Sequence, residues 1–210
     1  MKKKKIILID LGSNNIFSIY NALSLFSSVT VIKEYDKKIQ KCDFDILVIP
    51  GVGSFQSAMS ILESRNLIKL IKDSFYLNKK ILGICLGFQL FFTKSYEFGI
   101  NKGLNLINGE IVSFREKANF ITNIGWSKLS FDNFSDSYFK NLLDKKFFYH
   151  IHSYFLETDL NNISLTYTSK NDFTFTSSVL YKNIMGLQFH PEKSGKNGLN
   201  FLNSYINYDA

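Results

Sequence analysis

The first half of the chain alternates short apolar runs with segments of helical spacing. The runs consist mostly of Ile, Leu and Val and are apolar on both faces, which predicts strands buried in a parallel sheet. These predicted strands cover residues 6–10, 29–32, 46–49 and 81–84. Apolar residues at helical spacing lie between them, over 16–23 and 54–77. The alternation predicts an α/β fold with a doubly wound, mostly parallel central sheet and flanking helices.

From residue 109 onward the pattern changes to short strands separated by turn residues. The predicted strands cover 111–114, 128–131, 147–151, 153–157, 164–168, 174–180 and 184–189. Strands of this kind favour antiparallel pairing, so we expect an additional antiparallel section in the second half. A last amphipathic helix covers 194–205. The sequence contains neither a repeat nor a linker, which predicts a single domain over 1–210.

Charge and apolar patterning exclude two classes of partner. The net charge is +7, but apart from Lys2 to Lys5 the lysines are scattered and no groove-reading motif accompanies them. Nucleic acid is therefore not an expected partner. The apolar run after Lys5 is too short for a signal peptide, and no run reaches the roughly 18 residues of a membrane span. We expect a cytoplasmic protein without membrane contact.

The cysteines and histidines suit neither a disulfide framework nor a zinc site. There are two cysteines and three histidines, and their spacing matches no metal pattern. Cys42 lies just before a predicted strand, and we expect it to be structural. No disulfide, metal or cofactor is expected.

Cys85 stands where a buried strand turns into an apolar helix. Gly83 and Gly87 flank it in a Gly-x-Cys-x-Gly pattern, the cysteine counterpart of the serine nucleophile elbow, whose sharp turn pushes the nucleophile outward. The amino end of the helix favours a thiolate and offers N–H groups to an oxyanion. A lone cysteine in an apolar stretch is also compatible with a small core residue, so the motif alone leaves both interpretations open.

His190 and Glu192 form the second part of the candidate chemistry. They are two residues apart in Gln188-Phe-His-Pro-Glu192, so on an extended backbone both side chains project to the same side. Pro191 favours that backbone for the residue before it. A carboxylate beside an imidazole fixes its tautomer and stabilises its protonated form. An edge-strand histidine with a chance neighbour is the alternative, but together with the elbow the pair indicates a Cys-His-Glu triad.

Three loops of the first half are expected to meet at one edge of the sheet. Asp10 to Asn15, Pro50 to Gly53 and Cys85 each follow a predicted parallel strand. Ligands of doubly wound sheets bind at the carboxyl ends of the strands. The three loops therefore mark the expected site.

Three segments together resemble the class I, triad-type glutamine amidotransferases. They are Pro-Gly-Val-Gly at 50–53, Gly-Ile-Cys-Leu-Gly-Phe-Gln at 83–89 and Gln-Phe-His-Pro-Glu-Lys-Ser at 188–194. Gly125-Trp126 and His152-Ser-Tyr154 make the chain most similar to the glutaminase subunits of imidazole glycerol phosphate synthase. The resemblance covers essentially the whole chain and implies a glutaminase domain over 1–210.

The resemblance implies a role for each triad residue. Cys85 would attack the side-chain amide of glutamine, His190 would carry the proton, and Glu192 would orient His190. Water would then hydrolyse the glutamyl thioester, and the products would be glutamate and ammonia. No cofactor takes part in this chemistry.

The resemblance also implies which groups bind the substrate. The backbone N–H groups of Leu86 and Val52 would hold the oxyanion, and Gln89 would contact glutamine. As alternatives, Gln89 is a helix surface residue and Tyr154 a core residue. The full set assigned by resemblance is Val52, Gly53, Leu86, Gln89, Ser153 and Tyr154.

The implied partner is a synthase subunit that receives the ammonia in a heterodimer of histidine biosynthesis. We expect its docking face to surround the mouth of the site and to include Asn14, Asn15 and Lys193, although a merely solvated Lys193 is the alternative. We also expect the isolated chain to be nearly inactive, because the Val52 N–H points away from the oxyanion until the partner shifts the loop at 50–53.

Two segments depart from the family pattern and keep other functions open. Members commonly have Gly-Asn in the first loop and Pro-His ahead of Gly-Trp, whereas this chain has Ser13-Asn-Asn15 and Thr122-Asn123. The alternative recipient of ammonia is a sugar amidotransferase of surface-polysaccharide synthesis. From other classes, an elbow-cysteine hydrolase and a non-catalytic binding module remain. The His-Pro-Glu segment argues against the first and the complete triad against the second.

Overall fold

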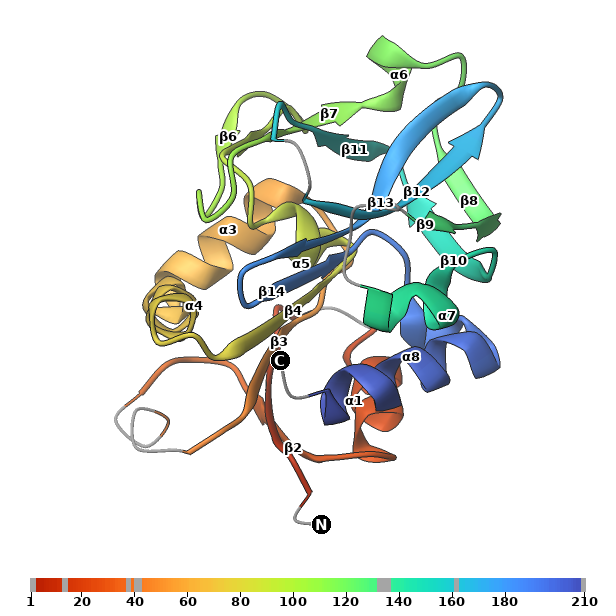
Figure 1. Cartoon of the computed structure of the whole chain (residues 1–210). Helices are drawn as coiled ribbons and strands as arrows, with labels where there is room; N and C mark the ends of the chain where they lie inside the picture. Colours follow the sequence, from red (N-terminus) through yellow and green to blue (C-terminus); the bar gives the residue numbers. More distant parts are fainter. Residues whose placement is uncertain are drawn as a thin grey trace.

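A mixed sheet forms the centre of the fold. The structure is a computed structural model that describes residues 3–12, 15–36, 39, 43–131, 137–160 and 163–208, so Cys42 and Asn14 lie outside the described residues. The strand order of the main sheet is β2-β1-β3-β4-β14-β13-β12-β9. Helices lie on both of its faces (Figure 1). The predicted α/β class is confirmed.

The strands from β2 to β14 in this order run parallel, as the first half of the sequence predicts. Their side chains alternate between the two faces, so Ile7 joins one core cluster and Leu8 the other. Because both faces are buried, the whole of each inner strand must be apolar. The strands are β1 Lys5–Ile9, β2 Ser28–Ile32, β3 Ile46–Ile49, β4 Lys80–Ile84 and β14 Ile184–Leu187.

Helices α3 and α4 cover one face of the sheet, and α1, α7 and α8 lie on the other (Figure 1). Leu62 and Leu70 pack in the cluster of Ile7, whereas Leu23 and Phe201 pack in the cluster of Leu8. The bounds are α1 Ile16–Ser24, α3 Phe55–Ser64, α4 Leu67–Tyr76, α7 Lys140–Leu143 and α8 Gly195–Asn207.

Two helical predictions differ from the structure. The segment 54–77 forms two helices, α3 and α4, because Asn66 between them takes a left-handed conformation with φ of 57°. The helix after Cys85 is only one turn long, α5 Leu86–Gln89. It ends early because the carbonyls of Leu90 and Phe91 accept hydrogen bonds from Leu104 and Leu106 instead of continuing the helix. Apolar spacing reveals neither break.

The antiparallel section predicted for the second half is present. Strand β13 pairs antiparallel with β14 and β12, and β12 pairs antiparallel with β9. Buried hydroxyl groups bond across this section, as between Thr166 and Ser178 at 2.7 Å. The strands are β9 Ser130–Phe131, β12 Ser164–Lys170 and β13 Phe173–Tyr181.

Two small sheets complete the fold, and three of their strands, β5, β6 and β8, were not predicted. Strand β8, with Gly125 at φ 117° and mixed polarity, lacks a strand-like pattern, and among the described strands it pairs with β10 alone. The run predicted over 128–131 divides between β8 and β9. One small sheet consists of β8 Asn123–Lys128 and β10 Phe147–His152. The other consists of β5 Lys94–Ser95, β6 Asn101–Lys102, β7 Glu110–Ser113 and β11 Tyr154–Glu157. The other described elements are α6 Phe114–Lys117, η1 Ser137–Phe139 and η2 Pro191–Lys193. Across the described ranges, no helix is long and apolar enough to cross a bilayer.

Two glycines let the loop after β3 lie directly against the elbow after β4. A Cβ atom on Gly87 would collide with the backbone carbonyl of Ile49, and one on Gly51 would lie 2.6 Å from the Cβ of Leu86. Neither contact can be relieved by rotating a flexible side chain. The elbow and the 50–53 loop are therefore in contact only because both positions lack a side chain.

Substituting Gly87 tests this constraint. We expect Gly87→Ala to lower the free energy of unfolding by about 3 kcal/mol, since overpacking against backbone is not relieved by rotamer changes. Gly195→Ala is the matched control, because a Cβ there meets open space and only the left-handed backbone opposes it, at about 1 kcal/mol. Urea unfolding of both variants measures the difference, and equal losses would contradict the steric account.

Candidate active site

Cys85 sits on a strained elbow between β4 and α5. Its backbone has φ of 53° and ψ of −105°, a conformation that non-glycine residues rarely adopt and that functional sites retain. The Cys85 N–H donates to Leu187 O at 2.7 Å, so pairing with β14 fixes the base of the turn. The residue is largely buried, with 7% of its surface exposed. The predicted elbow is confirmed.

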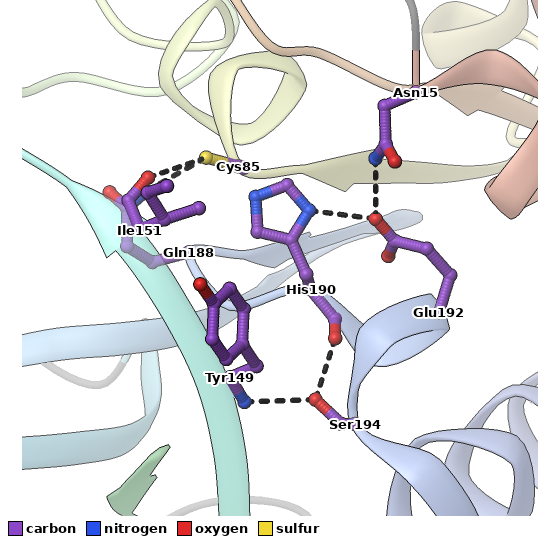
Figure 2. A network of polar contacts seen from close by, with 8 residues as sticks. All are labelled: Asn15, Cys85, Tyr149, Ile151, Gln188, His190, Glu192 and Ser194. Atoms are coloured by element: carbon purple, nitrogen blue, oxygen red, sulfur yellow. Dashed lines mark hydrogen bonds and ion pairs between the residues drawn. The ribbon is translucent and has the colours of Figure 1, made fainter. Parts of the chain in front are cut away.

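His190 and Glu192 lie beside the elbow and contact each other. The imidazole Nδ1 is 2.7 Å from Glu192 Oε1, and both side chains are fully buried. The other ring nitrogen, Nε2, has no hydrogen-bond partner of standard geometry among the described residues. Figure 2 shows this edge of the ring turned toward Cys85. The structure thus brings together the three residues that the sequence analysis grouped.

The prediction of an extended backbone through His190 and Glu192 is wrong in its second half. The backbone of His190 is extended and forms an isolated antiparallel β-bridge with Tyr149. The His190 N–H donates to the Tyr149 carbonyl at 2.8 Å. From Pro191 the chain turns into the 3₁₀ helix η2, because proline favours the first helical position. Ser194 Oγ holds the turn by donating to His190 O at 2.6 Å (Figure 2). The turn, not strand alternation, places the carboxylate beside the imidazole.

Asn15 has a different place from the predicted docking face. It is only 8% exposed, and its Nδ2 donates to Glu192 Oε1 at 2.7 Å (Figure 2). The side chain therefore supports the carboxylate that contacts His190. Lys193 is exposed, as expected, although it is the last residue of η2 and does not lie on a strand. Sequence spacing could not reveal the contact of Asn15, because it joins residues 177 positions apart.

Burial and charge have opposite effects on His190. Burial disfavours the imidazolium, but the negative charge of the Cys85 thiolate and the polar contacts with Cys85 and Glu192 outweigh it and raise the pKa of His190 to about 10. At neutral pH His190 is therefore an imidazolium. A positive charge beside a cysteine favours the thiolate form, which is the nucleophile.

The other two histidines are neutral. Burial lowers the pKa of His150 to about 4 and takes the pKa of His152 well below its usual value. In each ring Nδ1 contacts a backbone carbonyl, of Phe148 at 3.1 Å and of Tyr154 at 2.7 Å. A carbonyl can only accept, so both rings carry their proton on Nδ1. His150 is a fully buried structural residue, and the neutral ring of His152 lines the cavity beside Cys85.

A cavity of about 690 Å³ opens beside Cys85. All six residues that the resemblance assigned to substrate contacts line it, so the structure places them together. Glu97, Arg115 and Glu116 also line it, and the sequence analysis missed them because surface-type charges carry no local signal of a pocket. The lining comprises Val52, Gly53, Cys85, Leu86, Gln89, Tyr96, Glu97, Phe98, Ser113, Arg115, Glu116, Ile121, Ile151, His152, Ser153 and Tyr154.

The loop at 50–53 occupies the space above the elbow. Leu86 N–H donates to Gly51 O at 3.4 Å. In a trans peptide the carbonyl and the following N–H point in opposite directions. The Val52 N–H therefore points away from Leu86 in this structure.

Comparison with known proteins identifies the family and supports the fold of this chain. The family model "Glutamine amidotransferase class-I" matches residues 7–205. The chain belongs to the class-I glutamine amidotransferase family. A solved structure described as PurLQS from Thermotoga maritima superposes with a TM-score of 0.76, covering 98% of this chain and 99% of that chain at 20% identity, and supports the fold.

Closer relatives narrow the family. The chain is 38% identical to imidazole glycerol phosphate synthase subunit HisH of Sulfurimonas denitrificans, over 97% of this chain and 98% of the relative. It is 40% identical to the subunit of the same name from Carboxydothermus hydrogenoformans, over 93% and 96% of the two chains. At this similarity and coverage, the chain falls with the HisH subunits of the family.

Histidine NMR tests the electrostatics of the site. At pH 7 we expect one imidazolium, His190, and two neutral rings protonated on Nδ1. Because the pKa of His190 is raised, its proton is lost only as pH rises through about 10, whereas His150 gains one only as pH falls through about 4. Cys85→Ala should lower the His190 midpoint and leave the other two unchanged. Three rings that titrate together near pH 6.5 would contradict the assignment.

Proposed function

We propose that this chain hydrolyses glutamine through Cys85, His190 and Glu192 and supplies the ammonia to a synthase subunit of imidazole glycerol phosphate synthase. The observation that carries the proposal is the strained Cys85 elbow facing a buried His190–Glu192 pair at 2.7 Å, next to a cavity. Membership of the amidotransferase family supports the reaction, and the HisH relatives support the pathway. One domain spanning 1–210 would carry the activity.

In the first half-reaction Cys85 Sγ attacks the amide carbon of the glutamine side chain. The imidazolium of His190 donates its Nε2 proton to the departing nitrogen, the carbon–nitrogen bond breaks, and ammonia leaves a glutamyl thioester. Glu192 stabilises the imidazolium before this transfer and holds Nε2 toward Cys85. Asn15 keeps that carboxylate in place through its own bond to Oε1.

In the second half-reaction water replaces ammonia. Neutral His190 takes a proton from water as the oxygen attacks the thioester carbon, the carbon–sulfur bond breaks, and glutamate leaves. The thiolate and the imidazolium are then restored. The cavity lining offers Glu97 to the α-ammonium group of the substrate and Arg115 to its α-carboxylate, since opposite charges suit the two ends of a free amino acid.

The exposed face of the small β8–β10 sheet supports the docking of a partner. Ile124 pairs with Ile151, and Trp126 pairs with Tyr149, so these side chains project from one face. Ile124 and Trp126 are 58% and 57% exposed, which leaves a contiguous apolar surface. Ile151 also lines the cavity beside Cys85. We call this set of four side chains the β8–β10 face; a partner seated on it would cover the exit for ammonia.

The departure from the family's Pro-His pattern at Thr122-Asn123 gives no support to a different partner. Asn123 is buried, and its Nδ2 lies 3.4 Å from His152 Nε2, inside the fold. The change therefore leaves the β8–β10 face unaltered. Ser13 and Asn14 lie outside the described residues. The histidine-pathway partner is accordingly the proposal, and a sugar amidotransferase is the outcome to be tested against it.

Cys85→Ala tests the chemistry. We expect loss of ammonia release from glutamine with a loss of unfolding free energy below about 2 kcal/mol, because a small side chain at a turn fills little core volume. His190→Ala should be equally inactive. Cys42→Ala is the matched control and should keep near wild-type activity. Ammonia release by Cys85→Ala at the wild-type rate would overturn the triad.

Partner gating follows from the 50–53 loop. While Gly51 O accepts from Leu86 N–H, a carbonyl occupies the place of the oxyanion and the Val52 N–H cannot reach it. A docked partner with its acceptor bound would rotate this peptide, and the positive φ of Gly53 gives the loop the necessary freedom. Exposed Lys193 is the basic group placed to meet an acidic side chain of that partner, a contact worth under about 1 kcal/mol.

Steady-state glutaminase assays with and without a purified synthase subunit and its acceptor measure this coupling. We expect stimulation of about 5- to 150-fold, the usual span of allosteric coupling. Trp126→Ala should reduce the stimulation, whereas Tyr76→Ala, which removes an even more exposed aromatic residue away from the β8–β10 face, should not. Full activity of the isolated chain, unchanged by any synthase, would contradict gating but leave the triad intact. The synthase that stimulates identifies the pathway.

A further inference from the structure

Gln188 is a buried amide next to the nucleophile that the reaction described above does not use. It follows β14 directly and is 0% exposed. It does not line the cavity, so it does not contact a substrate there. Its side-chain Nε2 is 3.7 Å from Cys85 Sγ (Figure 2).

A chain of three polar groups fixes the direction of this amide. Gln89 Nε2 donates to Tyr154 O at 3.3 Å and to Gln188 Oε1 at 3.0 Å. A backbone carbonyl can only accept, so Tyr154 determines which end of Gln89 faces it. Gln89 in turn determines that the oxygen of Gln188 faces away from the sulfur. The Nε2 of Gln188 is left to point at Cys85.

The reversed amide orientation is excluded by the same contacts. If Gln188 were flipped, its NH₂ group would face the NH₂ group of Gln89, and its oxygen would face Cys85 Sγ. Two donors would then oppose each other, and an oxygen lone pair would oppose a thiolate. The orientation therefore follows from the network, which begins at a main-chain carbonyl.

The sulfur has a second polar neighbour with the opposite preference. Ile151 O is 3.8 Å from Cys85 Sγ and can interact favourably only with the protonated thiol, as an acceptor of S–H. Gln188 can interact favourably with the thiolate, as a donor. The two groups thus favour different protonation states of the same atom, and a hydrogen bond to a charged acceptor is the stronger kind.

We infer that Gln188 is a further catalytic residue, whose side-chain N–H donates to the Cys85 thiolate and stabilises the ionised nucleophile against the carbonyl of Ile151. The inference rests on the proposed function in that Cys85 is the nucleophile. The proton balance involves one transfer: the thiol proton moves to His190 Nε2, and Gln188 keeps both of its protons. Gln89 acts through Gln188 and is a positioning residue in this respect.

The pH dependence of Cys85 alkylation by iodoacetamide tests the inference without glutamine or a partner. The rate is measured by peptide mass spectrometry in a Cys42→Ala background, so that only one thiol reacts. Gln188→Met keeps the approximate size and removes the donor. We expect the midpoint of its rate profile to rise by about one pH unit and the rate at pH values below the parent midpoint to fall about tenfold, the effect of losing one charge-assisted hydrogen bond.

Two further variants distinguish hydrogen-bond donation by Gln188 from a role in filling space alone. Gln89→Met should shift the midpoint in the same direction by a smaller amount, because Gln188 keeps its donor but loses its anchor. Ser177→Ala is the matched control, since Ser177 is as deeply buried and bonds to His150 and Thr168. Its profile should coincide with the parent profile.

The inference is overturned if Gln188→Met, folded by its thermal transition, alkylates within twofold of the parent at every pH. A uniform fall in rate without a shifted midpoint would also overturn it, because that is the result of altered access alone. If Gln188→Met does not fold, the alkylation profile of Gln89→Met is judged by the same two criteria. A shifted profile in a chain that releases no ammonia from glutamine even with a synthase subunit and its acceptor present would refute the proposed function and leave this inference standing.

Discussion

The close approach of two backbone segments at Cys85 is the constraint on which the site depends. The 50–53 loop lies directly against the elbow, and that contact requires glycine at 51 and 87. Cys85 itself has an unfavourable positive φ, which pairing with Leu187 and packing of α5 must hold in place. Cys85, the end of β4 and the 50–53 loop are thus one steric unit.

The charges are arranged around this unit by residues from distant parts of the chain. His190 enters from the end of β14, the strand next to β4, and η2 returns Glu192 to the far side of its ring. Asn15 then reaches the same carboxylate from the loop after β1. Because the strands between them are parallel, their carboxyl ends are at one edge, and residues far apart in sequence become neighbours.

Two features of the site underlie the proposal that the chain acts with a partner. The Gly51 carbonyl bonds to the N–H group that an oxyanion would use, and the β8–β10 face exposes a tryptophan and two isoleucines beside the cavity. We propose that the first feature restrains turnover and that the second receives a partner. A glutaminase whose ammonia is needed elsewhere benefits from both, since free ammonia would otherwise diffuse away.

The sequence by itself determined the α/β class, the parallel inner strands, the elbow and the pairing of His190 with Glu192. Each of these rests on local composition: apolar runs buried on both faces, glycines around a cysteine, and a short spacing with proline. Only the tertiary structure decided the break at Asn66, the one-turn α5, strand β8, the inward position of Asn15 and the amide chain from Tyr154 through Gln89 to Gln188. All of these depend on contacts between residues far apart in the sequence or on a particular backbone conformation. Neither produces a periodic pattern in the sequence.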